Sequence, residues 1–262
     1  MAKYLTEFNT YADYSGATLS LPNVSLIKST GQVFYKNIFA GTVLGDILMY
    51  DVANQQLIST INANWNTSAF PIADFEPIAI NIYPADQTPD GKTRWMSLKW
   101  MSNASASGSA SIVGLLWGNN STVVGDITSI DQNAFNGRDN TDKALLLADG
   151  TSANTQAAFA AFYATNIFHT NGTSAGDWYV PSYKELSLYQ ANYSDINAQI
   201  TLIKNASSSI VNDVNGRQWT SIESNSNTQQ SYQIQPFAGG SSGFSTSSRT
   251  LNNIGVRGML SL

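Results

Sequence analysis

The stretch GDWYVPSYKEL, residues Gly176–Leu186, carries the strongest local signal for the fold of this chain. Pro181 fixes its own φ and lacks a backbone N–H, so it ends an extended segment and suits the start of a helix. Ser182 is followed three residues later by Glu185, which is the capping-box pattern of a helix N-terminus. Leu186 then begins the apolar face of that helix. The stretch therefore predicts a strand that leads directly into a capped helix.

Upstream of this stretch, the sequence predicts two β-hairpins. Apolar runs at residues 45–51 and 56–61 flank one turn, and runs at residues 77–83 and 93–100 flank a second turn that contains Pro-Asp-Gly. The second pair is rich in β-branched and aromatic side chains, which favour strands. Residues 102–111 alternate small and polar side chains, and we interpret them as a loop.

Helices and further strands are predicted in the second half of the chain. Residues 155–167 are rich in Ala with aromatic side chains on one face, and residues 195–204 carry three Ile at spacings of four and three. Short strands follow at residues 219–221, 232–235 and 254–260. The fold class is therefore α+β, with a mixed or antiparallel sheet and two to three helices.

Two later signals follow the opening stretch in a fixed order. Trp219-Thr220-Ser221 precedes Glu223, and Val256-Arg257 lies near the end of the chain. With the opening stretch, this order resembles a lectin-like family of bacteria and phages, whose pattern runs G-D-W-x-L-P-S-x-x-E-L, then W-[ST]-S-x-E, then V-R. The resemblance covers residues 41–262. It implies a C-type-lectin-like fold, which formylglycine-generating enzymes and the variable proteins of diversity-generating retroelements share.

The residues that carry the resemblance have the physical properties of scaffold residues. Trp178 and Trp219 are large apolar bodies that we expect at the junction between helix and sheet. We assign a scaffold role, and no catalytic role, to Trp178, Pro181, Ser182, Glu185, Leu186, Trp219, Glu223 and Arg257. The chain has no Cys, so formylglycine-generating activity is not implied. It also lacks the Glu-Pro-Asn or Gln-Pro-Asp signature of calcium-dependent lectins, so calcium-dependent sugar binding is not implied either.

Composition excludes several classes of function. Charged residues make up only 12% of the 262 residues, about half the usual ~25%, and Ser, Thr and Asn supply the polarity instead. The net charge of -5 argues against binding to nucleic acid, which needs clustered Lys and Arg. The single His169, expected near the end of the Ala-rich helix, makes a His-based metal centre improbable. No apolar run is long enough to span a membrane, so we expect no membrane insertion.

We expect neither a metal site nor a cofactor. Asp139, Asp142 and Asp149 lie near one another in sequence, but a hard cation needs more oxygen ligands at closer spacing. We interpret these three residues as a solvated helix or loop edge. A glycosidase with paired carboxylates is the enzymatic alternative, but no pair with distinct acid and base environments stands out, so we predict no enzyme activity.

The N-terminal segment differs from the rest of the chain. Its apolar residues follow no clean period, and two strand-like runs at residues 24–27 and 32–35 flank Thr30-Gly31. We predict an attachment arm over residues 1–40, a hairpin connector over 41–70 and the lectin-like domain over 71–262. A hairpin packed on its own domain is the alternative. The candidate attachment residues are Phe8, Tyr11, Tyr14, Leu19 and Leu21.

The layout of the whole chain also resembles structural proteins of phages that infect gut Bacteroidales, including the crAss-like group. That resemblance implies a virion fibre, decoration or tail-associated protein, with other capsid or tail proteins as partners and a homo-oligomer, such as a trimer, as its state. The start of the chain lacks an apolar signal core, which agrees with a particle released by lysis. The alternatives are a free carbohydrate-binding module and a receptor-binding protein diversified by a retroelement.

The segment 225–253 is the predicted ligand surface. Aromatic faces stack on sugars or pack against protein, while short amides and hydroxyls form adaptable hydrogen bonds. The expected ligand is a glycan or protein on the host cell. The alternative is that the aromatic side chains belong to the core. The candidate residues are Asn225, Asn227, Gln229, Tyr232, Ser241, Phe244, Arg249 and Asn252.

Overall fold

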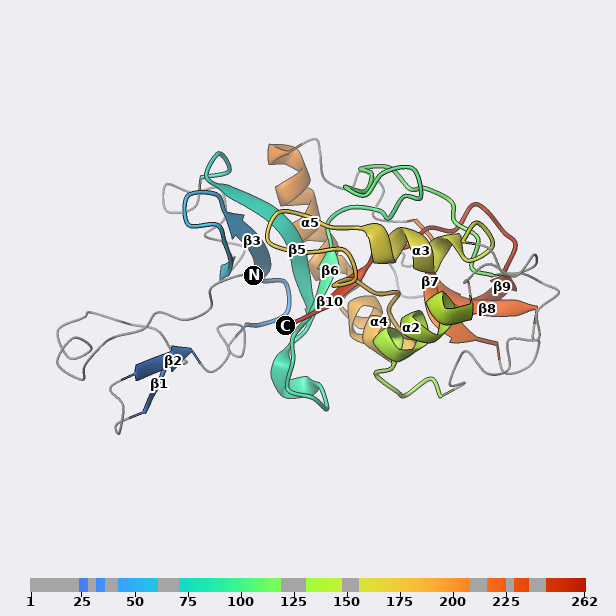
Figure 1. Ribbon diagram of the computed structural model, residues 1–262, viewed down its shortest axis with the longest axis horizontal. Helices are drawn as coiled ribbons and strands as arrows, with labels where there is room; N and C mark the ends of the chain where they lie inside the picture. The colour runs from blue at the N-terminus through green and yellow to red at the C-terminus, as the bar shows by residue number, and fades with distance from the viewer. Residues whose placement is uncertain are drawn as a thin grey trace.

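A five-stranded antiparallel sheet forms the centre of the molecule (Figure 1). It appears in a computed structural model that describes residues 24–27, 32–35, 42–60, 71–118, 131–147, 156–207, 216–224, 229–235 and 244–262. The strand order is β10-β6-β5-β3-β4, and both hairpins expected from the sequence are confirmed within it. The strands are β3 (Ile47–Asp51), β4 (Gln56–Thr60), β5 (Phe75–Tyr83), β6 (Arg94–Ser97) and β10 (Met259–Ser261).

The C-terminal strand completes this sheet by pairing with a strand from the first half of the chain. Met259 lies opposite Met96, and Leu260 lies opposite Trp95. Because β3 and β4 belong to the same sheet, the hairpin that we expected to be a connector over residues 41–70 is part of the main domain, and this corrects the expected boundary. Residues 61–70 lie outside the described residues.

Both faces of the sheet are buried, each by a different set of side chains. On one face, Trp95 and Leu260 join a core that includes Trp178 and Phe162 of α3. On the other face, Met96 and Met259 join a core that includes three Ile from α5. Side chains alternate between the faces of a strand, so neighbouring apolar residues along β6 and β10 can serve both cores.

Four helices are described. They are α2 (Gly137–Leu147), α3 (Ala160–Ile167), α4 (Tyr183–Ala191) and α5 (Tyr193–Ala206), and a 3₁₀ turn covers Ala85–Gln87. The helix predicted after Pro181 is confirmed as α4. The Ala-rich helix was predicted from residue 155 but begins at Ala160, because the buried Phe159 leaves helical geometry at φ -104° and ψ 39°. Helix α2 is an element beyond the three predicted.

A second, three-stranded sheet has the order β7-β8-β9. Its strands are β7 (Gln218–Glu223), β8 (Gln230–Ile234) and β9 (Phe244–Ser248). Helix α4 contacts β5 of the central sheet and β7 and β8 of the second sheet, so it joins the two (Figure 1). Strand β9 was not predicted, since its sequence FSTSS carries one large apolar residue and no alternation.

The N-terminal segment contains a separate two-stranded hairpin. Strands β1 (Val24–Ile27) and β2 (Gln32–Tyr35) pair in antiparallel register, as the strand-like runs predicted. The candidate attachment residues Phe8, Tyr11, Tyr14, Leu19 and Leu21 lie outside the described residues. The α+β class and the antiparallel sheet are therefore established, and the C-type-lectin-like assignment stays a prediction.

Candidate functional site

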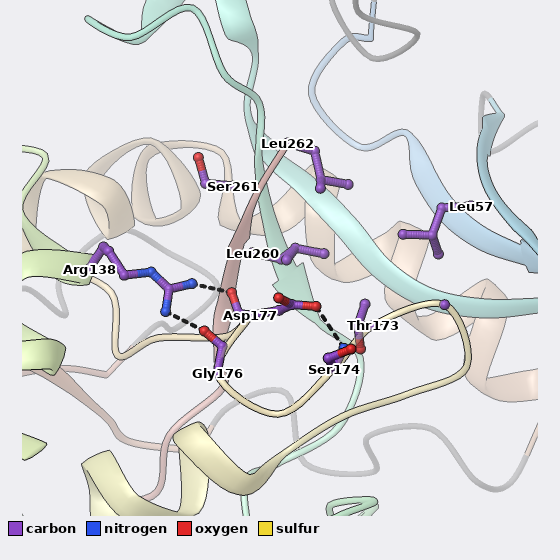
Figure 2. Close-up of a pocket in the computed structure, with 10 residues that line it drawn as sticks. Leu57, Arg138, Thr173, Ser174, Gly176, Asp177, Leu260, Ser261 and Leu262 are labelled. Carbon is purple, nitrogen blue, oxygen red and sulfur yellow. Dashed lines mark hydrogen bonds between the residues drawn. The ribbon is translucent and has the colours of Figure 1, made fainter. Parts of the chain in front are cut away.

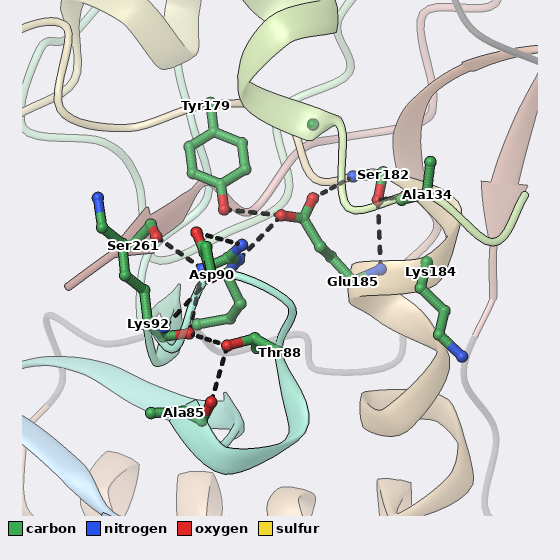
Figure 3. A network of polar contacts seen from close by, with 12 residues as sticks. Ala85, Thr88, Asp90, Lys92, Ala134, Tyr179, Ser182, Lys184, Glu185 and Ser261 are labelled. Atoms are coloured by element: carbon green, nitrogen blue, oxygen red, sulfur yellow. Dashed lines mark hydrogen bonds and ion pairs between the residues drawn. The ribbon is translucent and has the colours of Figure 1, made fainter. Parts of the chain in front are cut away.

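The capping box of α4 is the centre of a buried polar network (Figure 3). Ser182 Oγ accepts a hydrogen bond from the Glu185 N–H at 3.3 Å, and Glu185 Oε2 accepts one from the Ser182 N–H at 2.8 Å. These reciprocal bonds satisfy two N–H groups at the helix start that have no partner within the helix. The predicted cap is confirmed, although only 1% of Glu185 is exposed, which the sequence did not indicate.

The remaining oxygen of Glu185 binds two groups from other elements. Arg94 Nε donates to Glu185 Oε1 at 3.0 Å, and the Tyr179 hydroxyl donates to the same oxygen at 2.8 Å. Burial and the Glu185 charge together hold the pKa of Tyr179 well above its usual value, so Tyr179 keeps its proton and donates. Burial alone would lower the pKa of Arg94, but Tyr179, Asp90 and Glu185 raise it overall. Arg94 and Glu185 thus form a buried ion pair between β6 and α4.

The start of α2 packs directly against this network. A side chain at Gly137 would overlap Glu185 Oε2 and the backbone of Ser182. Thr141, one turn later, accepts a hydrogen bond from the Val180 N–H at 2.9 Å. Glycine is therefore required at this position so that α2 can approach the capped end of α4.

A second buried ion pair connects Glu223, the last residue of β7, with Arg249, which directly follows β9. Arg249 Nη2 lies 2.6 Å from Glu223 Oε1, and the guanidinium lies over the Trp117 ring with 5.0 Å to its centroid. Burial lowers the pKa of Arg249, and the Glu223 charge opposes that shift. Arg249 has no exposed surface. Its assignment to a ligand surface was wrong, because the side chain turns inward to meet a carboxylate that lies 26 positions away in sequence.

The other residues of the sequence pattern are buried as well. The Trp178 indole donates to Thr173 Oγ1 at 3.0 Å, the Trp219 indole donates to the Leu115 carbonyl at 2.8 Å, and Arg257 Nε donates to the Ser97 carbonyl at 2.8 Å. Pro181 and Leu186 are also buried. From Trp178 onward, these pattern residues therefore lie in the interior, whereas Asp177 at the start of the pattern is exposed.

A solvent-open cavity of about 550 Å³ lies between the central sheet and the loop before Trp178 (Figure 2). Its lining includes Leu57 from β4, Leu260 and Leu262 at the end of the chain, Arg138 from α2 and the loop 172–177. The volume falls within the range of ordinary small-molecule sites. The sequence did not indicate this cavity, because its walls come from four separate segments.

The polar wall of the cavity is held by internal contacts. Arg138 Nη1 donates to the Gly176 carbonyl at 2.6 Å, and its Nη2 donates to the Asp177 carbonyl. The Arg138 guanidinium lies over the Tyr179 ring with 4.7 Å to its centroid. Asp177 Oδ2 accepts the Ser174 N–H at 2.6 Å. The charges of Arg138 and Asp177 therefore serve first to fix the loop that forms the wall.

An aromatic cluster lies where α4 meets the edge of the small sheet. The Tyr183 ring stacks on Phe244 with 3.5 Å between centroids and meets Tyr232 edge-on at 5.5 Å. All three side chains are half-buried. Burial and the neighbouring Tyr232 raise the pKa of Tyr183. The structure thus brings together two of the predicted ligand residues and adds Tyr183, whose only sequence signal was its place after the cap.

The structure describes two of the remaining predicted ligand residues, Gln229 and Asn252. Both are exposed. Phe244 also packs against the core that contains Ile234, so part of its area is structural. Asn225, Asn227 and Ser241 lie outside the described residues.

Neither a metal-binding cluster nor a membrane-spanning helix is found among the described residues. Within those ranges, no group of three or more His, Asp or Glu is placed to hold a metal ion. Asp139 and Asp142 are exposed on α2, and Asp149 lies outside the described residues. His169 lies just beyond α3, and its Nδ1 is 3.1 Å from the Ile167 carbonyl oxygen. No helix in the described part of the chain is long and apolar enough to cross a bilayer.

Comparisons with known proteins give one distant structural match. No family model matches the sequence, and no curated protein matches it. The chain resembles a fimbrial protein from Bacteroides ovatus with 16% sequence identity and a TM-score of 0.48. The match covers 84% of this chain and 48% of that protein, so this chain spans about half its length. Similarity at this level establishes neither a shared fold nor a shared function.

Proposed function

We propose that this protein is a non-enzymatic structural protein of a virus particle. The protein attaches to the particle through its N-terminal arm. It displays a C-type-lectin-like domain that binds a glycan or protein on the host surface. The observation that carries the binding role is the half-buried cluster of Tyr183, Tyr232 and Phe244. Partly exposed aromatic rings offer flat apolar area and, in Tyr, a polar atom, which suits contact with sugars and proteins.

The framework behind the cluster supports a display role. Tyr183 directly follows Ser182, the N-cap of α4. Ser182 is hydrogen-bonded to Glu185, which in turn accepts a hydrogen bond from Arg94. Strand β8, which carries Tyr232, pairs with both neighbours in the small sheet. Recognition side chains held on rigid elements lose less conformational freedom on binding than those on loops.

The charged groups of the sequence pattern support the absence of catalysis. Glu185 and Glu223 are each buried and each contacts an Arg side chain at 3.0 Å or less. A carboxylate acting as general acid or base must reach the reacting atoms. Glu185 and Glu223 instead contribute to the stability of the domain.

The proposed binding is weak at each site and is strengthened by the many copies of the protein on one particle.

Adsorption of multivalent protein to host cells tests the binding role. Tyr232→Ala and Phe244→Ala should each reduce adsorption, while Tyr163→Ala, which removes a half-buried Tyr of α3, serves as the matched control. Each variant is also melted, so that adsorption is compared among folded proteins. Normal adsorption by both cluster variants contradicts the assignment. Mass spectrometry and antibody labelling of purified particles test the virion role separately.

A further inference from the structure

The edges of the two larger sheets are covered to different degrees. On β10, Met259 exchanges backbone hydrogen bonds with Tyr179 at 2.8 and 3.0 Å. On β7, the N–H groups of Trp219 and Ser221 donate to the carbonyls of Gly255 and Pro181 at 2.9 and 2.8 Å. One edge of each sheet is therefore closed by another part of the chain.

Among the residues that the structure describes, the edge formed by β4 is open. Within the described residues, the backbone of residues 56–59 forms its ladder only with β3, and no other hydrogen bond involves it. The strand reads Gln-Leu-Ile-Ser-Thr, without a proline, a charge or a bulge in its pairing with β3. Proteins usually protect an edge with such features, because unpaired N–H and C=O groups bind another strand.

Strand β9 forms the other edge that has no partner strand among the described residues, and it is a poorer site for strand addition. Its sequence FSTSS supplies mainly short hydroxyl side chains. On β4, by contrast, Leu57 and Ile58 pack toward the two cores on opposite faces of the sheet. A strand added beside β4 can therefore extend both apolar faces, which adds hydrophobic burial to the backbone hydrogen bonds.

The N-terminal hairpin of β1 and β2 has the features of a segment that could pair with the β4 edge. Strands β1 and β2 form a sheet of their own with two strands, and a two-stranded hairpin is marginal in water by itself. Their sequences, VSLI and QVFY, are uncharged. The hairpin does not pair with β4 of its own chain in this structure.

We propose that the β1–β2 hairpin of a second copy adds to the β4 edge and extends the five-stranded sheet across two copies. Each copy then donates one hairpin and accepts another. Such a head-to-tail contact either closes into a ring or continues as a filament. The inference rests on the proposed role of the N-terminal segment as an attachment arm, and it names the surface that receives the hairpin.

Crosslinking between differently labelled copies tests this contact. The chain contains no Cys, so Ser59→Cys on β4 can be mixed with Ser25→Cys on β1 or with Gln32→Cys on β2, and treated with a short bifunctional thiol reagent. Only contacts between copies link two different single variants. The matched control replaces Ser59→Cys with Ser245→Cys on the β9 edge. We expect several-fold more mixed dimer at residue 59 than at residue 245.

A charge on the receiving edge provides a second readout. Ser59→Lys should lower the average mass in light scattering and leave the melting temperature of the domain unchanged, because Lys on an edge opposes strand addition. A full-length chain that is monomeric at high micromolar concentration overturns the proposal, as does a yield at residue 59 no greater than at residue 245. Particle incorporation is measured separately, so failure of the attachment role is distinguishable from failure of this contact.

Discussion

Replacing Glu185 with Leu removes the centre of the network in Figure 3. The substitution deletes the hydrogen bonds that Glu185 accepts from Arg94, Tyr179 and the Ser182 N–H, at 3.0, 2.8 and 2.8 Å. Leu has a comparable apolar volume, so the main change is the loss of charge and of acceptors. Arg94, only 4% of whose side chain is exposed, is left with Asp90 as its remaining carboxylate partner.

The expected loss of stability follows from that geometry. Removing one partner of a buried ion pair costs roughly 3–5 kcal/mol, because the other charge stays buried without compensation. Loss of half of the capping box adds about 1 kcal/mol. We therefore expect Glu185→Leu to lower the free energy of unfolding by about 4–6 kcal/mol, a large share of the roughly 5–15 kcal/mol typical of a domain.

A double-mutant cycle separates the ion pair from other effects. Free energies of unfolding are measured at pH 7 by urea titration with tryptophan fluorescence, for Glu185→Leu, Arg94→Met and both together. The double variant should cost at least about 2 kcal/mol less than the sum of the single variants, since removing both charges leaves none unpaired. Glu76→Gln, on an exposed contact with Asn171, is the control. Additivity within about 0.5 kcal/mol refutes the reasoning.

Four further predictions concern pH, the second ion pair, the arm and metal. Burial raises the pKa of Asp46 from 3.8 to about 6, and the hydrogen bond from the Val43 N–H opposes this shift to a smaller extent. The stabilisation that protonated Asp46 provides is therefore complete below pH 3.8 and is lost as the pH rises through about 6. Asp46→Asn should therefore flatten the melting temperature between these pH values. Glu223→Gln should cost about 3 kcal/mol in urea unfolding, because Arg249 stays buried, whereas Asn252→Ala should cost less than about 0.5 kcal/mol. Deletion of residues 1–40 should leave a folded, soluble domain that no longer enters particles, and an unfolded product would place the arm in the core. Melting with and without EDTA should give the same curve, and a drop of several degrees with EDTA would reveal a structural cation.

The local elements of this protein were predictable because their causes lie within a few residues. The hairpin of β3 and β4 follows from two apolar runs around a short turn, and the start of α4 follows from Ser182 and Glu185 three positions apart. In both cases the residues that interact are neighbours in sequence. The fully buried Phe159 shows the limit of such reasoning, because it adopts a non-helical conformation within the run that favours a helix, and α3 begins only after it.

The α+β class, most of the strands and helices and the scaffold role of Trp178, Pro181 and Glu185 could be predicted from the sequence alone. The partners of those residues, by contrast, depend on tertiary packing. Arg94 meets Glu185 across 91 positions, and Arg249 turns inward to Glu223 instead of facing solvent. The cavity, the aromatic cluster and the open β4 edge likewise depend on segments that are distant in sequence. Composition and spacing report local preferences, whereas a buried charge or an open edge is set by which distant segments the fold brings into contact.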